Sequence, residues 1–282
     1  MTRLESYGDR LRKNDYRCHS RFRRAVNFFD GRSMVALVDR GVGPGPHHVI
    51  ISGIDPQKIE NLTVSADGLL VDGAPYPFEA SCRYDSGVDP GGAVDHVRFA
   101  ANLEHFDRRL RQSAKPKSLA FLLAGKPEQR RRSALERSVA ERLRAGSEMV
   151  FSPGFLGGIK MVRGVGFGLT PGGDDFIGGL LLALHCGQKI FRRDFAPAIR
   201  AAYTLAVGRN PFSNMLLAQA SQGRAIAKIK DLLAALVGGG ENDVDRCAKE
   251  LRSIGYSSGI DFGTGLLLAL QKLNRTEGEK WW

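Results

Sequence analysis

A ten-residue segment that occurs twice constrains the fold of this chain more than any other feature. Residues 175–184 read DFIGGLLLAL and residues 261–270 read DFGTGLLLAL, so the two copies agree at eight of ten positions. Glycine inside a helix costs about 1 kcal/mol relative to alanine and usually marks the close approach of two backbones. We therefore expect two apolar helices that pack against each other through Gly179 and Gly265.

The starts of these two helices predict a binding site. Each copy begins with an aspartate, and a helix N-terminus attracts anions because its first backbone N–H groups have no helical partner. If the helices pack as expected, both N-termini open onto one pocket, where two positive helix ends meet one anion. Six residues would line that pocket: Thr170, Asp174, Asp175, Ser257, Ser258 and Asp261. The simpler alternative is a pair of ordinary core helices with capped starts.

A glycine-rich stretch, residues 154–179, leads into the first of these helices. Thr170 and Pro171 favour a sharp turn, since threonine can cap a helix and proline loses only an N–H that would lack a helical partner. Gly172 and Gly173 can adopt positive φ and have no side chain, so their backbone N–H groups could approach a phosphate or carboxylate closely. The stretch is interpreted as an anion-binding loop.

Asp174 and Asp175 are the candidate catalytic residues. Both fall in the first turn of the predicted helix, where the helix dipole favours negative charge. Adjacent residues on a helix point about 100° apart, so one aspartate can cap the helix while the other faces a ligand or a hard cation such as Mg²⁺. The alternative is a tight turn with a cap and no further role.

The hydrophobic periodicity changes once along the chain. Up to about residue 89, short runs of strand propensity alternate with turns, which predicts hairpins at residues 25–38 and 62–71 and a strand at 48–51. In the first hairpin, Asp30-Gly31 is typical of a two-residue type I′ turn.

Beyond residue 95 the apolar residues follow helical spacing. Helices are predicted at residues 97–110, 133–144, 175–187, 194–207 and 211–220. Strands followed by helices predict an α+β protein, with an antiparallel β domain over residues 1–92 and a helical domain over 93–282 that carries the site.

Composition narrows the range of partners. The net charge is +11, with arginine clusters at residues 17–24 and 130–132, but only Phe22 provides an aromatic beside them, so we expect no nucleic-acid partner. Anionic substrates or an acidic partner subunit explain the net positive charge equally well. The sequence has no run of about twenty apolar residues, so we expect no membrane span. Four scattered cysteines fit a cytoplasmic protein.

The string GVGFGLTPGGDDFIGGLLLAL, residues 164–184, resembles the signature of a bacterial family first known as a domain of unknown function. Members of this family are similar to the third subunit of oxamate carbamoyltransferase. The resemblance implies a reaction that interconverts oxalurate plus phosphate with oxamate plus carbamoyl phosphate during anaerobic allantoin breakdown. It also implies sister subunits as partners, one of them similar to acyl-CoA ligases.

Two later stretches extend the resemblance. The family pattern of a serine, paired leucines and A-x-x-G matches Ser213, Leu216, Leu217 and residues 220–223, although Ser213 could also be a helix cap. Residues 255–261, GYSSGID, resemble the family motif G-H-T/S-S-G-x-D, with Tyr256 in place of the usual histidine. Any acid–base role of that histidine is therefore in question here.

The expected function is that of an oxamate carbamoyltransferase subunit. The candidate residues for binding an anionic substrate are Gly166, Gly168, Thr170, Gly172, Gly173, Ser213, Ser257, Ser258, Gly259 and Asp261. A freestanding metal-dependent hydrolase that uses the same aspartates is one alternative, and a non-catalytic scaffold subunit that binds a small anion is the other. A hydrolase would act alone with a divalent metal, whereas a transferase subunit would need its partners.

Overall fold

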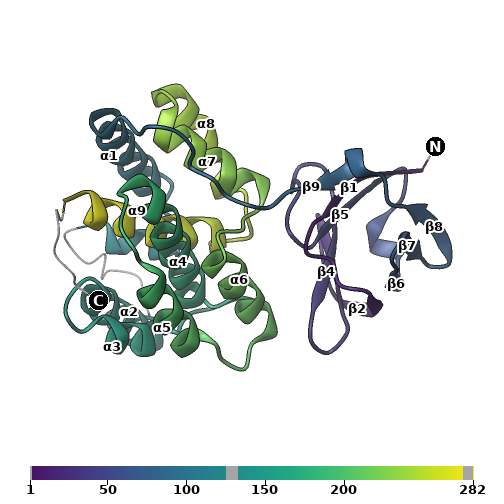
Figure 1. Cartoon of the computed structure of the whole chain (residues 1–282). Helices are drawn as coiled ribbons and strands as arrows, with labels where there is room; N and C mark the ends of the chain where they lie inside the picture. The colour runs from purple at the N-terminus through teal and green to yellow at the C-terminus, as the bar shows by residue number, and fades with distance from the viewer. Residues whose placement is uncertain (1, 125–132, 276–281) are drawn as a thin grey trace. The chain divides into compact units, whose positions relative to one another are not determined.

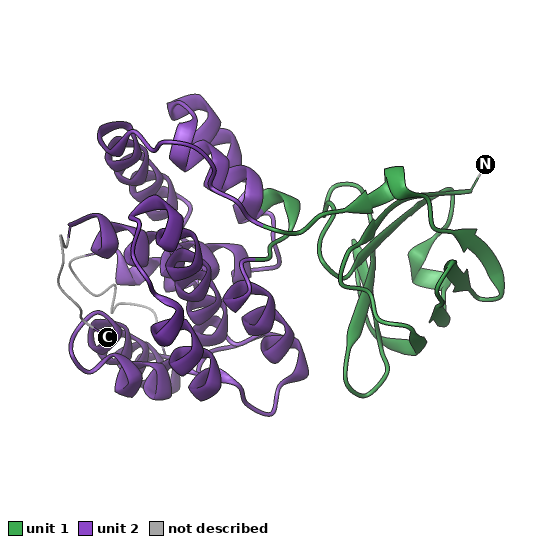
Figure 2. Ribbon diagram, viewed as in Figure 1, with its two compact units in different colours: residues 1–87, 224–228 green, residues 88–223, 229–282 purple. Residues whose placement is uncertain are grey.

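The computed structural model describes residues 2–124, 133–275 and 282. The expected α+β class is confirmed (Figure 1). The chain forms two compact units: unit 1 comprises Met1–Gly87 with Arg224–Lys228, and unit 2 comprises Val88–Gly223 with Ile229–Trp282 (Figure 2). The predicted division falls after residue 92, whereas these units divide after Gly87 and again around the short second segment of unit 1. The arginine cluster at residues 130–132 lies outside the described residues.

Over its described residues, unit 1 contains one sheet with the strand order β8-β7-β6-β2-β3-β4-β5-β1-β9 (Figure 1). The strands are β1 Arg3–Gly8, β2 Asn14–Phe22, β3 Ala25–Phe29, β4 Met34–Val38, β5 His48–Ser52, β6 Asn61–Val64, β7 Gly68–Val71, β8 Ala74–Pro77 and β9 Arg83–Tyr84, with 3-10 turns at Pro56–Lys58 and Ala80–Cys82. Alternate residues of these strands are buried in one core, which includes Tyr16, Phe28, Leu37, Val49 and Leu62.

Both predicted hairpins and the strand between them are confirmed, but the sheet is mixed rather than antiparallel throughout. The pairs β4–β5 and β1–β9 are parallel, because the chain crosses over between their strands instead of turning back. The turn after β3 is also longer than predicted. It spans residues 30–33, and the Asp30 carboxylate closes it by accepting the N–H groups of Arg32 and Ser33 at 2.7 and 2.6 Å.

The short second segment of unit 1 is held by polar contacts within that unit. Arg224 Nη1 forms an ion pair with Asp9 Oδ2 at 2.5 Å and donates to Ser86 Oγ at 3.1 Å. The N–H of Ala225 donates to the Ser86 carbonyl at 3.0 Å. Sequence periodicity does not indicate such a return, because it involves only a few residues without a repeating pattern.

Unit 2 is helical. Its elements are α1 His96–Gln112, α2 Ala134–Val150, α3 Phe155–Val162, α4 Gly172–Ile190, α5 Ala196–Ala206, α6 Pro211–Ser221, α7 Ala227–Gly238, α8 Glu241–Arg252 and α9 Ser258–Arg275, with a 3-10 turn at Leu119–Leu122; the first two residues of α7 are assigned to unit 1. Figure 1 shows α4 in the middle of this unit, and almost every residue of α4 is buried.

The glycine-rich stretch is not a single loop, contrary to the interpretation from sequence. Phe155, Ile159 and Val162 follow helical spacing and are buried, so residues 155–162 form α3 despite two glycines. Only residues 163–171 connect α3 to α4. No helix among the described residues is long and apolar enough to cross a bilayer.

Candidate active site

The site is built on the contact between α4 and α9, the two helices that contain the repeated segment. A Cβ atom placed on Gly179 would lie 2.0 Å from the Phe262 carbonyl oxygen, and one placed on Gly265 would lie 2.0 Å from the Phe176 carbonyl oxygen. Each glycine therefore lets one helix backbone touch the other. The predicted packing through Gly179 and Gly265 is confirmed.

This contact predicts a large effect of a small substitution. Gly265→Ala should lower the free energy of unfolding by about 3 kcal/mol, because the new methyl group meets backbone that cannot move aside. Gly238→Ala, at the end of α7, is the matched control, since an added Cβ there meets nothing within 4 Å. The control should be neutral or stabilising by up to about 1 kcal/mol. Urea denaturation measures both, and equal effects would contradict the packing argument.

The helix pair brings two carboxylates together in the first turns of α4 and α9. Asp175 is 2% exposed and Asp261 is 1% exposed. The hydroxyl groups of Thr170 and Ser258 hydrogen-bond to Asp175, while Asp261 Oδ1 accepts the Leu119 N–H at 2.6 Å and Asp261 also receives a hydrogen bond from Ser257. Within the described part of the chain, Oδ2 of each aspartate is buried and has no hydrogen-bond partner.

Burial gives both carboxyl groups unusual proton affinities. It raises the pKa of Asp175 well above its usual range, and the negative charge of Asp261 raises that pKa further. Burial also raises the pKa of Asp261 to about 7, although the hydrogen bonds from Leu119 and Ser257 and the charge of Lys115 oppose the shift. Both carboxyl groups therefore keep their protons to a higher pH than an exposed aspartate does.

Asp174 has a different environment from its neighbour. It is buried, and its Oδ1 accepts the backbone N–H of Gly164 at 2.6 Å, which ties the connection between α3 and α4 to the first turn of α4. Of the two candidate catalytic residues, Asp174 thus makes a structural contact and Asp175 faces Asp261.

The glycines of the connection shape the backbone around the pair. Gly166 and Gly168 have φ values of +129° and +104°, which strongly favour glycine. A Cβ on Gly173 would lie 2.1 Å from the Val162 carbonyl oxygen, so this glycine permits the close turn into α4. A Cβ on Gly172 would lie 2.9 Å from Asp261 Oδ2. Gly172 therefore lets Asp261 Oδ2 lie close to the start of α4.

The hydroxyl groups of Thr170, Ser257 and Ser258 belong to half-buried residues, in contrast to the fully buried aspartates. Thr170 Oγ1 and Ser258 Oγ are 3.4 Å apart, so the two helix starts meet here as well as at the carboxylates. The structure thus brings together five of the six residues predicted to line one pocket, while Asp174 contacts the adjoining backbone.

Sequence reasoning missed two groups at this site, Lys115 and the Leu119 N–H. Lys115 Nζ donates to the carbonyl oxygens of Arg252 and Tyr256 at 3.0 and 2.6 Å, and its charge acts on Asp261. Neither residue belongs to a recognisable motif, and both lie far from Asp261 in the sequence, so no local signal identifies them.

The remaining predicted residues lie in other environments. Ser213 is buried in the first turn of α6, and its Oγ has no hydrogen-bond partner within the described residues, while Asn210 caps this helix. Gly259 is required for packing, since a Cβ there would lie 1.9 Å from the Leu251 carbonyl oxygen. The exposed ring of Tyr256, which replaces the family histidine, lies 5.6 Å from Lys115 Nζ.

Asp174 and Asp175 are also the candidate ligands for Mg²⁺. Across residues 2–124 and 133–275, no three His, Cys, Asp or Glu side chains are grouped so that they could hold a metal ion. One oxygen of Asp174 is already bound to the Gly164 N–H. Asp174 and Asp175 therefore do not fit a protein-built cation site by themselves.

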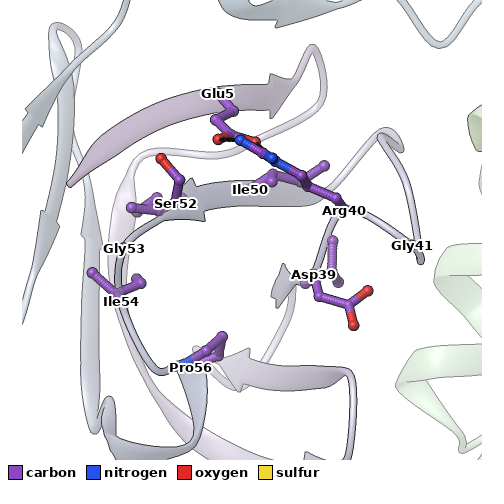
Figure 3. Close-up of a pocket in the computed structure, with 11 residues that line it drawn as sticks. Glu5, Asp39, Arg40, Gly41, Ile50, Ser52, Gly53, Ile54 and Pro56 are labelled. Atoms are coloured by element: carbon purple, nitrogen blue, oxygen red, sulfur yellow. Dashed lines mark hydrogen bonds and ion pairs between the residues drawn. The ribbon is translucent and has the colours of Figure 1, made fainter. Parts of the chain in front are cut away.

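A separate pocket of about 440 Å³ lies in unit 1 and has none of the predicted site residues in its lining (Figure 3). Its two acidic side chains are paired with arginines. Figure 3 shows the Arg40 side chain against the Glu5 carboxylate, and Arg24 Nε lies 2.8 Å from Asp39 Oδ2. Because these charges compensate each other, we place the candidate chemistry at the buried aspartates instead.

The fold and the carboxylate pair define an α+β protein with an acidic site between two helix starts. A model of one family, described as oxamate carbamoyltransferase subunit AllH, matches residues 162–270. The matched segment runs from the end of α3 into α9 and includes both Asp175 and Asp261, so the resemblance to this family is confirmed over that part of the chain. No curated protein and no solved structure matches the chain.

Proposed function

We propose that this chain is a subunit of an oxamate carbamoyltransferase and that its Asp175–Asp261 site binds the small substrate. The observation that carries the proposal is the position of the family match, which includes both buried aspartates and the helix contact that holds them. The proposed reaction transfers a carbamoyl group between oxalurate and phosphate, with oxamate and carbamoyl phosphate on the other side.

The charge of the chain supports this assignment. The proposed substrates are all anions, and a net charge of +11 attracts anions and acidic protein surfaces alike. We propose that sister subunits, one of them similar to acyl-CoA ligases, complete the enzyme in the cytoplasm. Their association should weaken as salt rises, because electrostatic attraction between complementary surfaces is screened.

Reconstitution tests the proposal. The purified chain alone should show no carbamoyl transfer, and the co-expressed set of subunits should form carbamoyl phosphate from oxalurate and phosphate. Carbamoyl phosphate is measured directly, and gel filtration at low and high salt follows assembly. Hydrolysis by the chain alone with a divalent metal would favour the hydrolase alternative. A set that is equally active without this chain would contradict the proposal.

A further inference from the structure

The charge of the site restricts which part of a substrate can enter it. Asp175 and Asp261 occupy the first turns of α4 and α9, so the positive ends of both helices already face carboxylates of the chain itself. A second anion placed beside two buried carboxyl groups would be repelled by any negative charge that they carry. The expectation that the converging helix ends bind an anion therefore conflicts with the side chains present there.

The two unpartnered oxygens indicate a ligand that supplies hydrogen-bond donors. Buried polar atoms are almost always paired, and a carboxylate oxygen without a partner is costly to bury. Oδ2 of Asp175 and Oδ2 of Asp261 both lack a partner within the described residues, and Gly172 presents no side chain to the latter. A primary amide fits such a pair because its NH₂ group offers two N–H donors and its carbonyl oxygen accepts from a protonated carboxyl group.

We infer that Asp175 and Asp261 bind the neutral amide end of the substrate and hold its anionic end away from the buried carboxylates. This inference rests on the proposed function, in which oxalurate, oxamate and carbamoyl phosphate each carry an H₂N–C=O group. We assign the anionic end to Lys115, whose charge already acts on Asp261. The hydroxyl groups of Ser257 and Ser258 already donate to Asp261 and Asp175, so they hold the two carboxyl groups in place for the ligand.

Oxamate and pyruvate test this inference directly. The two anions have nearly the same shape, but oxamate has NH₂ where pyruvate has CH₃. Isothermal titration of the assembled complex should give a dissociation constant for oxamate at least about tenfold lower than for pyruvate, because pyruvate leaves the buried acceptors unpaired. Equal affinities, or no oxamate binding by a complex that carries out transfer, would overturn the inference.

Two variants separate the pair from the rest of the site. Asp261→Asn should reduce the preference for oxamate to about threefold or less, since the asparagine can place an NH₂ donor where the amide needs an acceptor. Asp95→Asn is the matched control. Asp95 caps α1 by accepting the N–H groups of Val97 and Arg98, and asparagine caps equally well. Loss of the preference in the control, or its retention in Asp261→Asn, would contradict the inference.

The same measurements distinguish this inference from the proposed function. Carbamoyl transfer by the assembled subunits without a preference for oxamate over pyruvate would contradict the amide-binding role and leave the proposed function intact. A clear preference for oxamate in an assembly that transfers no carbamoyl group would support amide binding and contradict the proposed function.

Discussion

Asp261→Asn is expected to reduce carbamoyl transfer by the assembled enzyme at least about 100-fold, and Asp175→Asn should have a similar effect. Each substitution replaces a fixed acceptor in a preorganised, water-excluded site, where single groups commonly contribute factors of this size. Asparagine keeps an oxygen that can accept the Leu119 N–H, so the fold should be retained. Initial rates of carbamoyl phosphate formation are the measurement, with circular dichroism as a check on folding.

The neighbouring aspartate provides an informative comparison. Asp174→Asn can still accept the Gly164 N–H through its amide oxygen, so its loss of activity should be about tenfold or less. Asp95→Asn, at the start of α1, should match the wild-type rate. If Asp174→Asn were the most damaging of the four variants, the assignment of the site to Asp175 and Asp261 would be wrong.

The contribution of Asp261 to the stability of the chain should fall as pH rises from about 4 to about 7. Asp261 has a folded-state pKa raised from 3.8 to about 7, so between these values the folded state binds more protons than the unfolded state. The contribution of this group to the free energy of unfolding therefore decreases with pH across this window, by roughly 4 kcal/mol at about 1.4 kcal/mol per pH unit. Asp175 is shifted in the same direction and adds to the effect. His47, whose pKa is lowered to about 4 by desolvation, contributes in the opposite direction.

Denaturation curves of the wild type and Asp261→Asn between pH 4 and pH 8 isolate this contribution. Other titrating groups are common to both proteins, so they largely cancel in the difference between the two free energies of unfolding. Asp261→Asn should gain stability relative to the wild type as pH rises and be the more stable protein at pH 8. A difference that stays constant over this range would show that the buried carboxyl groups titrate normally.

The sequence predicted what depends on local pattern. The repeated segment identified the two central helices and their contact, because glycine at one position and leucines around it are sufficient to specify close packing. Strands with alternating or continuous apolar residues were also found. β1 and β2 were missed before residue 17, since charged residues interrupt their pattern, although Tyr16 is fully buried in the core.

What the sequence did not reveal depends on contacts between distant residues. Lys115 and the Leu119 N–H reach Asp261 only through the folding of unit 2, and Arg224 reaches Asp9 only when its segment joins unit 1. The charge state of the two aspartates also could not be predicted from the sequence pattern. Their positions in two helix starts suggested anion binding, whereas their burial and unpartnered oxygens are what indicate an amide.

The return of Arg224–Lys228 to unit 1 has a consequence for the order in which the protein folds during synthesis. The N-terminal sheet leaves the ribosome long before Arg224 is made. The ion pair of Asp9, whose side chain is only 8% exposed, therefore cannot form until Arg224 has been translated. A nascent chain stopped before residue 224 would leave that carboxylate without its arginine and the Ser86 carbonyl without the Ala225 N–H. The first unit to be translated is therefore completed only after most of the second has emerged.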